Sequence, residues 1–281
     1  MKFGASSYIW AEIFGIEHCG ILPRLKEAGL DGIEIGILLP ATFPASAIRK
    51  ELEKSGLECT SCSTMPTGTS LTANDAGSRR RARVHIEDCI KAMADAGGHV
   101  FCGPIYSPVG YFSGGRRTED EWRRGVESWQ QIAPVAVKNG VQIAIEPLNR
   151  FETYFLNTVA DAAAFCDAVN HPSVGILVDT FHANIEEKGI GAALKRAGKH
   201  LKHIHSCEND RGTPGTGHVN WPEFFASVKS LGYDGWMVIE SFGFSLGTLS
   251  AAASIWRDIE QDPESIAFEG VKYLRQAASR G

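Results

Sequence analysis

The stretch IAIEPLNRFETY, residues 143–154, begins as an apolar, β-prone run and changes abruptly into a polar turn at Glu146. Three later segments repeat this pattern, since GILVD ends in Asp179, LKHIH ends in His205 and WMVIE ends in Glu240. A carboxylate at the end of a buried strand needs a partner, because burying an unpaired charge is costly. Four apolar runs that each end in a metal-capable residue indicate one shared site.

Strands and helices alternate along the whole chain. We expect strands at residues 2–6, 32–35, 56–63, 99–103, 141–146, 175–179, 201–205 and 236–239. We expect helices at residues 19–28, 44–55, 75–96, 119–138, 158–169, 190–197 and 221–231, with two more at 249–259 and 263–279. Eight alternating units without a linker predict an α/β fold, a (β/α)8 TIM barrel with extra C-terminal helices, in a single domain, residues 1–281. A doubly wound open sheet is the alternative, but the first strand lacks the glycine fingerprint of that fold.

The composition argues against a nucleic-acid-binding protein and against a membrane protein. The 281 residues are 43% hydrophobic and 22% charged, with a formal net charge of −5. Nucleic-acid-binding domains usually carry a basic excess, so we expect no nucleic-acid partner. No run approaches the roughly 18 apolar residues of a membrane span, and the N-terminal residues lack a signal-peptide core. We therefore expect no membrane partner and a cytoplasmic location.

The seven cysteines do not form a disulfide framework, because their number is odd and they are scattered over the chain. Cys59 and Cys62 make a CxxC pair, but it lies on a predicted strand, and no second pair completes a zinc site. We interpret the cysteines as small packing residues in a reducing compartment.

Two other motifs have simpler interpretations than phosphate binding. The basic cluster Arg79, Arg80, Arg81 and Arg83 lies on a predicted helix without a Gly-rich loop nearby, which favours a solvated helix face or a subunit contact. The pair Gly114–Gly115 does not fit the spacing of a nucleotide fingerprint. We expect it to lie in a flexible loop over the mouth of the site.

The four strand-end residues converge if the chain folds as a barrel. The strands of a TIM barrel are parallel, so their C-terminal ends lie on one face, where active sites form. Because strand side chains alternate in direction, the four residues point inward at the rim while the residue before each points outward to the helices. One acid at a strand end is usually a cap or an ion-pair partner, but four in register on consecutive strands predict a site.

Three carboxylates and one imidazole predict a divalent metal site. Without a cation, the carboxylates would repel and raise one another's pKa. An oxygen-rich donor set favours a fairly hard ion such as Mn²⁺, Mg²⁺ or Co²⁺, whereas zinc more often comes with additional His or Cys ligands. His203 lies one layer deeper than His205, so we expect it to pack or to support the site.

Three blocks of the sequence resemble a known family. They are IEPLNRFETYFLNT from Ile145, DTFHANIEE from Asp179 and HIHSCENDRGTPGTGHVNW from His203. These blocks are similar to the ketose 3-epimerases, the D-tagatose 3-epimerase or D-psicose (allulose) 3-epimerase family, which belong to the xylose-isomerase-like TIM barrels. The likeness covers nearly the whole chain, and its most specific part lies between Glu146 and Glu240.

The resemblance implies a role for each matched residue. The positions that match the metal ligands, with Mn²⁺ as the first expectation, are Glu146, Asp179, His205 and Glu240. Of these, Glu146 and Glu240 also match the two catalytic carboxylates. The positions that match those holding the O1 and O2 end of the sugar are Glu152, His182 and Arg211.

The chemistry of epimerisation agrees with these assignments. Inverting the carbon beside a ketone requires removal of a weakly acidic C3 proton and storage of the charge as an enediolate. A divalent ion stabilises that charge, and a second acid on the opposite face returns the proton. We therefore expect a cytoplasmic, homodimeric or homotetrameric isomerase that epimerises a free ketose of the D-psicose/D-fructose, D-tagatose or L-ribulose type.

The N-terminal loops depart from the family pattern, which leaves the substrate preference open. Members often carry an aromatic residue at the position of Ser6 and a Trp at that of Phe14, and FCGPIYSP after Val100 also differs. Rival activities are a 1,2-ketose/aldose isomerase of the hydroxypyruvate isomerase type and an inosose dehydratase-like lyase. A DNA-repair nuclease of the same superfamily is disfavoured by the acidic balance, and a non-catalytic sugar-binding protein leaves the paired carboxylates unexplained.

Overall fold

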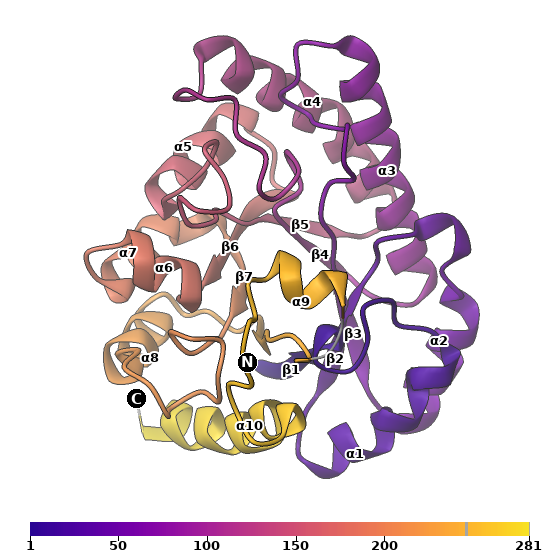
Figure 1. Cartoon of the computed structure of the whole chain (residues 1–281), viewed down its shortest axis with the longest axis vertical. Coiled ribbons are helices and arrows are strands. Elements are labelled where there is room, and N and C mark those ends of the chain that lie inside the picture. Colours follow the sequence, from indigo (N-terminus) through magenta and orange to yellow (C-terminus); the bar gives the residue numbers. More distant parts are fainter. Residues whose placement is uncertain (245–246, 281) are drawn as a thin grey trace.

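The computed structural model describes residues 1–244 and 247–280, which contain a closed barrel of parallel strands (Figure 1). The strands are β1 (Lys2–Ser6), β2 (Gly32–Gly36), β3 (Glu58–Cys62), β4 (Val100–Gly103), β5 (Gln142–Ile145), β6 (Val174–Asp179), β7 (Leu201–His205) and β8 (Trp236–Ile239). Each strand pairs in parallel with the next, and β8 pairs with β1 to close the barrel. The predicted (β/α)8 fold is confirmed.

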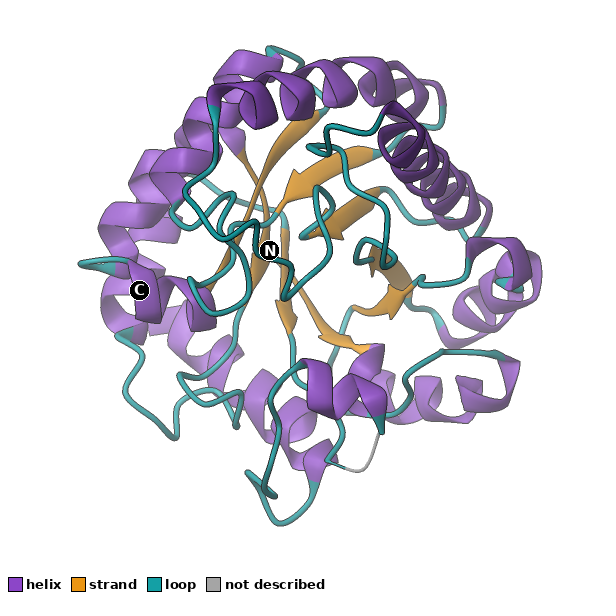
Figure 2. Cartoon of the chain, turned by 45° about the horizontal axis from the view of Figure 1, so that its top comes forward, coloured by secondary structure: helices purple, strands orange, loops and turns teal. Residues whose placement is uncertain are grey.

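Helices surround the barrel on its outside (Figure 2). They are α1 (Leu22–Glu27), α2 (Ala45–Ser55), α3 (Ala76–Asp95), α4 (Glu119–Lys138), α5 (Val159–Val169), α6 (Thr180–Glu186), α7 (Ile190–Ala197), α8 (Trp221–Ser230), α9 (Thr248–Ala252) and α10 (Pro263–Arg280). Of the two C-terminal helices, α10 packs on β8 and β1 and completes the outer ring. Among the described residues, no helix combines the length and the apolar character that crossing a bilayer requires.

Apolar residues fill two separate layers, inside and outside the barrel. The residues directly before the four strand ends lie in the outer core against the helices: Ile145, Val178, Ile204 and Ile239. The residues two before Glu146 and Asp179 are Ala144 and Leu177, which pack inside the barrel with Cys62 and Cys102. This is the predicted alternation, and it directs the strand-end side chains to the inner rim.

Two helices differ from the prediction by several residues, and one helix was not predicted. The helix expected at residues 19–28 starts as a 3₁₀ helix, Ile16–Ile21, before α1 begins. The helix expected at 249–259 is wrong in length, because α9 ends at Ala252 and Ser254 takes a left-handed conformation with φ of 56°. The sequence interpretation missed α6, a helix of seven residues that starts directly after the strand-end Asp179.

The seven cysteines lie in the interior, and two arginines of the basic cluster make local contacts. All seven cysteines are free and buried. In the basic cluster, Arg79 donates to the carbonyl groups of Ala73 and Asn74, and Arg81 lies 3.9 Å from the Asp75 carboxylate. These arginines therefore make local contacts around the start of α3.

Candidate active site

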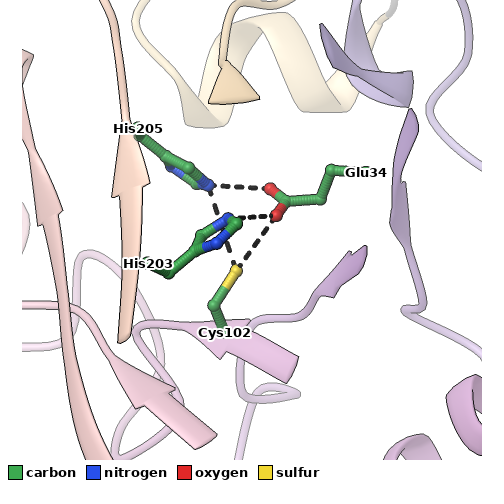
Figure 3. A group of neighbouring side chains, drawn as sticks. All are labelled: Glu34, Cys102, His203 and His205. Atoms are coloured by element: carbon green, nitrogen blue, oxygen red, sulfur yellow. Dashed lines mark hydrogen bonds and ion pairs between the residues drawn. The ribbon is translucent and has the colours of Figure 1, made fainter. Parts of the chain in front are cut away.

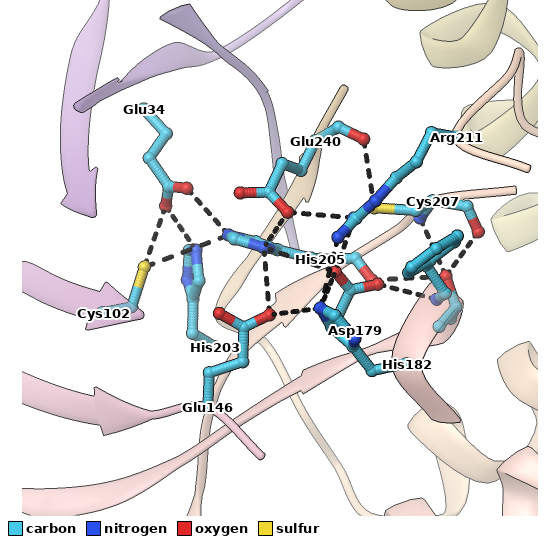
Figure 4. A network of polar contacts seen from close by, with 12 residues as sticks. Glu34, Cys102, Glu146, Asp179, His182, His203, His205, Cys207, Arg211 and Glu240 are labelled. Carbon is cyan, nitrogen blue, oxygen red and sulfur yellow. Dashed lines mark hydrogen bonds and ion pairs between the residues drawn. The ribbon is translucent and has the colours of Figure 1, made fainter. Parts of the chain in front are cut away.

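The four strand-end residues meet at the C-terminal end of the barrel (Figure 4). Glu146 directly follows β5, Asp179 and His205 end β6 and β7, and Glu240 directly follows β8. All four are buried, and one potential ligand atom from each lies within 4.8 Å of the others. The imidazole Nδ1 of His205 is 3.3 Å from Glu240 Oε2, 3.8 Å from Asp179 Oδ2 and 3.9 Å from Glu146 Oε1. The predicted convergence is thus present in the fold.

Local hydrogen bonds hold two of these residues in place. The Glu146 amide donates to the Gly103 carbonyl at 3.0 Å, which extends the β4–β5 pairing by one residue and holds the side chain at the rim. Asp179 is the N-cap of α6, where its Oδ1 accepts from the Phe181 amide at 2.7 Å. The capping bond engages only one oxygen, so Oδ2 remains directed at the centre.

Arg211 brings a buried positive charge to the same place. Its Nη1 lies 2.7 Å from Asp179 Oδ2 and 2.9 Å from Glu240 Oε2. The guanidinium group is 4.1 Å from the Phe181 ring centroid and 5.5 Å from that of Phe242. Two aromatic faces and two carboxylates thus orient Arg211 over the site.

His182, on α6, presents a neutral ring to the cavity. Its Nδ1 accepts the Asn149 amide at 3.1 Å, while Arg211 Nη2, also a donor, lies 3.2 Å from its Nε2. That nitrogen lies 3.6 Å from Glu146 Oε1. Burial lowers the pKa of His182 to about 3, so the ring is uncharged at neutral pH.

Glu152 reaches the cavity from the turn after β5. Its Oε1 accepts from Asn149 Nδ2 at 2.8 Å, and burial raises the pKa of its carboxyl group. The turn is tied to α6 by Arg150, whose Nε and Nη2 each lie 2.9 Å from a Glu186 oxygen. This bidentate pair holds the turn that carries Glu152 against the helix that carries His182.

These side chains line one cavity of about 480 Å³, a volume suited to a small molecule. The charged and polar lining includes Glu146, Glu152, His182, Arg211 and Glu240. The apolar wall of the cavity includes Tyr8, Leu38, Met65, Val109, Leu148, Phe242 and Leu249. Helix α9 forms part of this wall and lies over the barrel end in Figure 1. The cavity therefore offers both polar groups for recognition and apolar surface for packing.

Some residues of the loops that depart from the family pattern line the cavity, and others do not. From the N-terminal loop, Tyr8 and Glu12 line it, whereas Phe14 packs in the outer core. After β4, the lining comes from Gly103, Pro104, Pro108 and Val109. The pair Gly114–Gly115 is exposed and lies outside this lining.

The pKa values of the buried Glu146 and Asp179 carboxyl groups are shifted in opposite directions. Burial, and then the charges of Glu240 and Asp179, raise the pKa of Glu146 well above its usual range. Burial alone would also raise the pKa of Asp179, but Arg211 and His205 outweigh it and hold that pKa well below its usual range. Glu146 therefore tends to keep a proton, while Asp179 remains ionised.

Two buried polar atoms mark where a cation fits. Among the described residues, Glu146 Oε1 and His205 Nδ1 have no hydrogen-bond partner, although both are buried. Such atoms are costly to bury unless something else satisfies them. Three carboxylates and one imidazole at this spacing suit a divalent ion, since it would engage both atoms and offset the carboxylate repulsion.

The sequence interpretation assigned no role to Glu34, which lies directly beneath this cluster. It occupies the middle of β2 and is fully buried, with one oxygen 2.7 Å from His203 Nε2 and the other 2.7 Å from His205 Nε2. Burial would raise the pKa of Glu34, but the two histidines outweigh it and lower that pKa. The signal in the sequence is an acid within the apolar strand GIEIG, whose partners lie on another strand.

The chain is similar over nearly its whole length to known sugar epimerases. The profile of the xylose isomerase-like TIM barrel family matches residues 22–277. A probable ketose 3-epimerase of Synechocystis sp. is 38% identical, with 98% of this chain and 96% of that protein aligned. An L-ribulose 3-epimerase of Methylomonas sp. is 30% identical, with 98% of this chain and 97% of that protein aligned.

The fold is also similar to that of a solved structure that contains a bound sugar. The crystal structure of D-allulose 3-epimerase from Methylomonas sp. in complex with D-allulose superposes with a TM-score of 0.93 at 28% identity. The superposition covers 99% of this chain and 97% of that one. This chain therefore belongs to the ketose 3-epimerase family, within the xylose isomerase-like TIM barrels.

Proposed function

We propose that this protein is a metal-dependent ketose 3-epimerase that inverts C3 of a free ketose. The observation that carries the proposal is the pair Glu146 and Glu240, which reach the same cavity from β5 and β8. Their surroundings differ, since Glu146 Oε1 has no hydrogen-bond partner among the described residues while Glu240 Oε2 lies 2.9 Å from Arg211 Nη1. Epimerisation by deprotonation and reprotonation needs one carboxylate base and one carboxylic acid, and this pair supplies both.

In this scheme the two glutamates act on opposite faces of the substrate. One accepts the C3 proton as the enediolate forms, and the other donates a proton to C3 from the second face. The roles exchange when the reaction runs in reverse, so each glutamate must function as both acid and base. Their approach to His205 Nδ1 from two different strands, at 3.9 Å for Glu146 and 3.3 Å for Glu240, supports this division.

The residues proposed to hold the metal ion are Glu146, Asp179, His205 and Glu240. When bound, a divalent ion supplies the positive charge that stabilises the oxygens of the enediolate. Mn²⁺ is our first expectation, with Mg²⁺ and Co²⁺ as alternatives, because carboxylate-rich donor sets favour such ions.

We further propose that Glu152, His182 and Arg211 hold the O1 and O2 end of the sugar. Arg211 is a donor, the neutral His182 ring offers one donor and one acceptor nitrogen, and Glu152 is an acceptor when it is ionised. The cavity is lined by four acidic residues, Glu12, Glu146, Glu152 and Glu240, which disfavour an anionic substrate such as a sugar phosphate. An uncharged ketose fits this charge distribution better.

The proposed substrates are ketoses of the D-psicose/D-fructose, D-tagatose or L-ribulose type. The relatives described above support both sizes, because one is named for L-ribulose and another binds D-allulose. The apolar wall formed by Tyr8, Leu38, Phe242 and Leu249 would then face the far end of the sugar. A homodimer or homotetramer stays a prediction, which light scattering after size-exclusion chromatography tests directly.

The test is a substrate panel with matched variants. The purified protein with Mn²⁺ is incubated with D-fructose, D-psicose, D-tagatose and L-ribulose, and the products are separated by chromatography. We expect a C3 epimer from at least one ketose, and a loss of activity of about 10³-fold or more in Glu240→Gln. Glu187→Gln is the control, because this buried carboxylate caps α5 outside the cavity and should leave turnover unchanged.

Three outcomes would contradict the proposal. An aldose product would indicate a 1,2-isomerase, and loss of water would indicate a lyase. No reaction with any of the four ketoses, from protein that is folded and loaded with Mn²⁺, would remove the proposed substrate class.

A further inference from the structure

A buried hydrogen-bond network lies beneath the candidate metal centre (Figure 3). The Glu34 carboxylate joins the two histidines of β7, with 2.7 Å from Oε1 to His205 Nε2 and 2.7 Å from Oε2 to His203 Nε2. Oε2 also accepts from the Thr60 hydroxyl at 2.9 Å and from the Cys102 thiol at 3.3 Å. Four groups from β3, β4 and β7 thus converge on one carboxylate.

The direction of these hydrogen bonds follows from the chemistry of a carboxylate. An ionised carboxylate only accepts hydrogen bonds, so each imidazole must present an N–H group to it. His203 and His205 therefore both carry a proton on Nε2. The distances of 2.7 Å are those of strong, charge-assisted hydrogen bonds.

Holding the proton of His205 on Nε2 determines what its other nitrogen can do. The ring then offers the Nδ1 lone pair, and Nδ1 is the atom that faces Glu146, Asp179 and Glu240. The opposite tautomer would place a proton on Nδ1 and remove the imidazole as a ligand. The tautomer of His205 is therefore determined by its hydrogen bond to Glu34, on the side of the ring away from the cavity.

We propose that Glu34 is a positioning residue for the metal centre, which fixes the tautomer and the ring orientation of His205 so that Nδ1 is available to the cation. His203 on β7 and Thr60 on β3 in turn hold the Glu34 carboxylate in place. The inference rests on the metal site of the proposed function and adds a residue that contacts neither metal nor sugar.

The same residues do not have the spacing of a second metal site. Two ligand atoms on a tetrahedral zinc ion with bonds of 2.0–2.1 Å lie about 3.3 Å apart, and those on an octahedral Mg²⁺ ion about 2.9 Å. The two Glu34 oxygens lie only 2.7 Å from their histidine nitrogens, which is the distance of a direct hydrogen bond. The geometry therefore favours a supporting network over a bound ion.

The first test is the variant Glu34→Gln. Its amide has only one accepting oxygen, so one of the two histidines meets an N–H donor and its proton must leave Nε2. We expect Mn²⁺ to bind about 10–100-fold more weakly than to the wild type, measured by calorimetric titration without sugar. The matched control is Glu187→Gln, a buried carboxylate remote from the network, which should bind Mn²⁺ as the wild type does.

The second test reads the tautomer directly and uses the wild-type protein, so it stands even if Glu34→Gln does not fold. With ¹⁵N-labelled histidine and bound Mg²⁺, we expect the Nε2 of His205 to carry a slowly exchanging, strongly downfield proton, and Nδ1 to carry none. An unprotonated Nε2 would overturn the inference.

Failure of the positioning role of Glu34 and failure of the proposed metal-dependent function give different results. Folded Glu34→Gln that binds Mn²⁺ as tightly as the wild type would overturn the positioning role alone. A wild-type protein that binds no divalent ion would instead contradict the metal-dependent function itself.

Discussion

Glu146 is the residue at which function and stability conflict most clearly. It is buried beside two other carboxylates, and one of its oxygens lacks a hydrogen-bond partner among the described residues. Burial, Glu240 and Asp179 all raise its pKa. A group arranged in this way is destabilising until a cation or a proton satisfies it, which is common in sites built for chemistry.

Replacing Glu146 by Gln should therefore stabilise the metal-free protein. Because the folded-state pKa is raised, the folded protein holds the proton more tightly than the unfolded chain, whose pKa is near 4.5. The wild type consequently loses stability as the pH rises from about 4.5 through the folded-state pKa. We expect Glu146→Gln to gain on the order of 1 kcal/mol above this range, or about 2–4 °C in the melting temperature, and nothing at pH 4. A lower melting temperature for the variant at pH 8 would contradict this account.

Arg211 should have the opposite effect, since it supplies the positive charge nearest to Asp179 and Glu240. Arg211→Met leaves both carboxylates without that partner, and breaking a buried ion pair costs about 3–5 kcal/mol. We expect a matching loss in urea unfolding of the metal-free protein, partly recovered by saturating Mn²⁺. The control Arg150→Met removes an exposed arginine from its pair with Glu186 and should cost far less, since exposed ion pairs contribute little. Equal losses in the two variants would show that Arg211 does not compensate the buried charge.

The sequence predicted the strand-end residues and missed Glu34 for a physical reason. Glu146 and Glu240 stand out because each ends a short apolar run, and the alternation of strand side chains then gives their direction. Glu34 also interrupts an apolar strand, but its meaning depends on partners on β7, which is remote in the chain. The identity of a cross-barrel partner is set by barrel closure and register, which local periodicity does not contain.

At the scale of elements, the short helices were the hardest to predict. Helix α6 has only seven residues and begins at Asp179, a residue already interpreted as a strand end. The same carboxylate caps the helix and faces the cluster, so one residue has two local roles. Helix α9 is also short, because five residues are followed by a left-handed Ser254 instead of a further turn. Long amphipathic helices such as α4 were predicted with their observed bounds.

The contact between the end of β2 and the 3₁₀ helix Ser7–Ile9 depends on a glycine. A Cβ atom at Gly36 would lie 2.3–2.5 Å from the Tyr8 ring, which lines the cavity. Gly36→Ala should therefore displace Tyr8 and cost about 1–3 kcal/mol, as overpacked cores usually do. The control Gly20→Ala adds a Cβ with no atom within 4 Å and should be near neutral. Chemical unfolding of both variants checks this, and equal stabilities would contradict the packing described.

At the scale of the whole molecule, the barrel places four distant segments at one point, so a bound ion links strands β5 to β8. A ligand that binds only the folded state stabilises it by RT ln(1 + [L]/Kd), or about 2.7 kcal/mol at 100 times Kd. We expect chelation to lower the melting temperature and Mn²⁺ to restore it. The gain should be larger at pH 8 than at pH 5, because protons compete for the raised-pKa carboxyl group of Glu146. A pH-independent gain would argue against Glu146 as a ligand.

The central claim is proton exchange at C3 of a ketose, and isotope exchange with solvent tests it most directly. The protein with Mn²⁺ is incubated in D₂O with the ketose that gives the fastest turnover, and the deuterium content of each carbon is read by NMR. We predict one deuterium at C3 of the epimeric product, none at C1, and no exchange in Glu240→Gln or in protein stripped of metal. Deuterium at C1, or an epimer formed without deuterium at C3, would contradict the account.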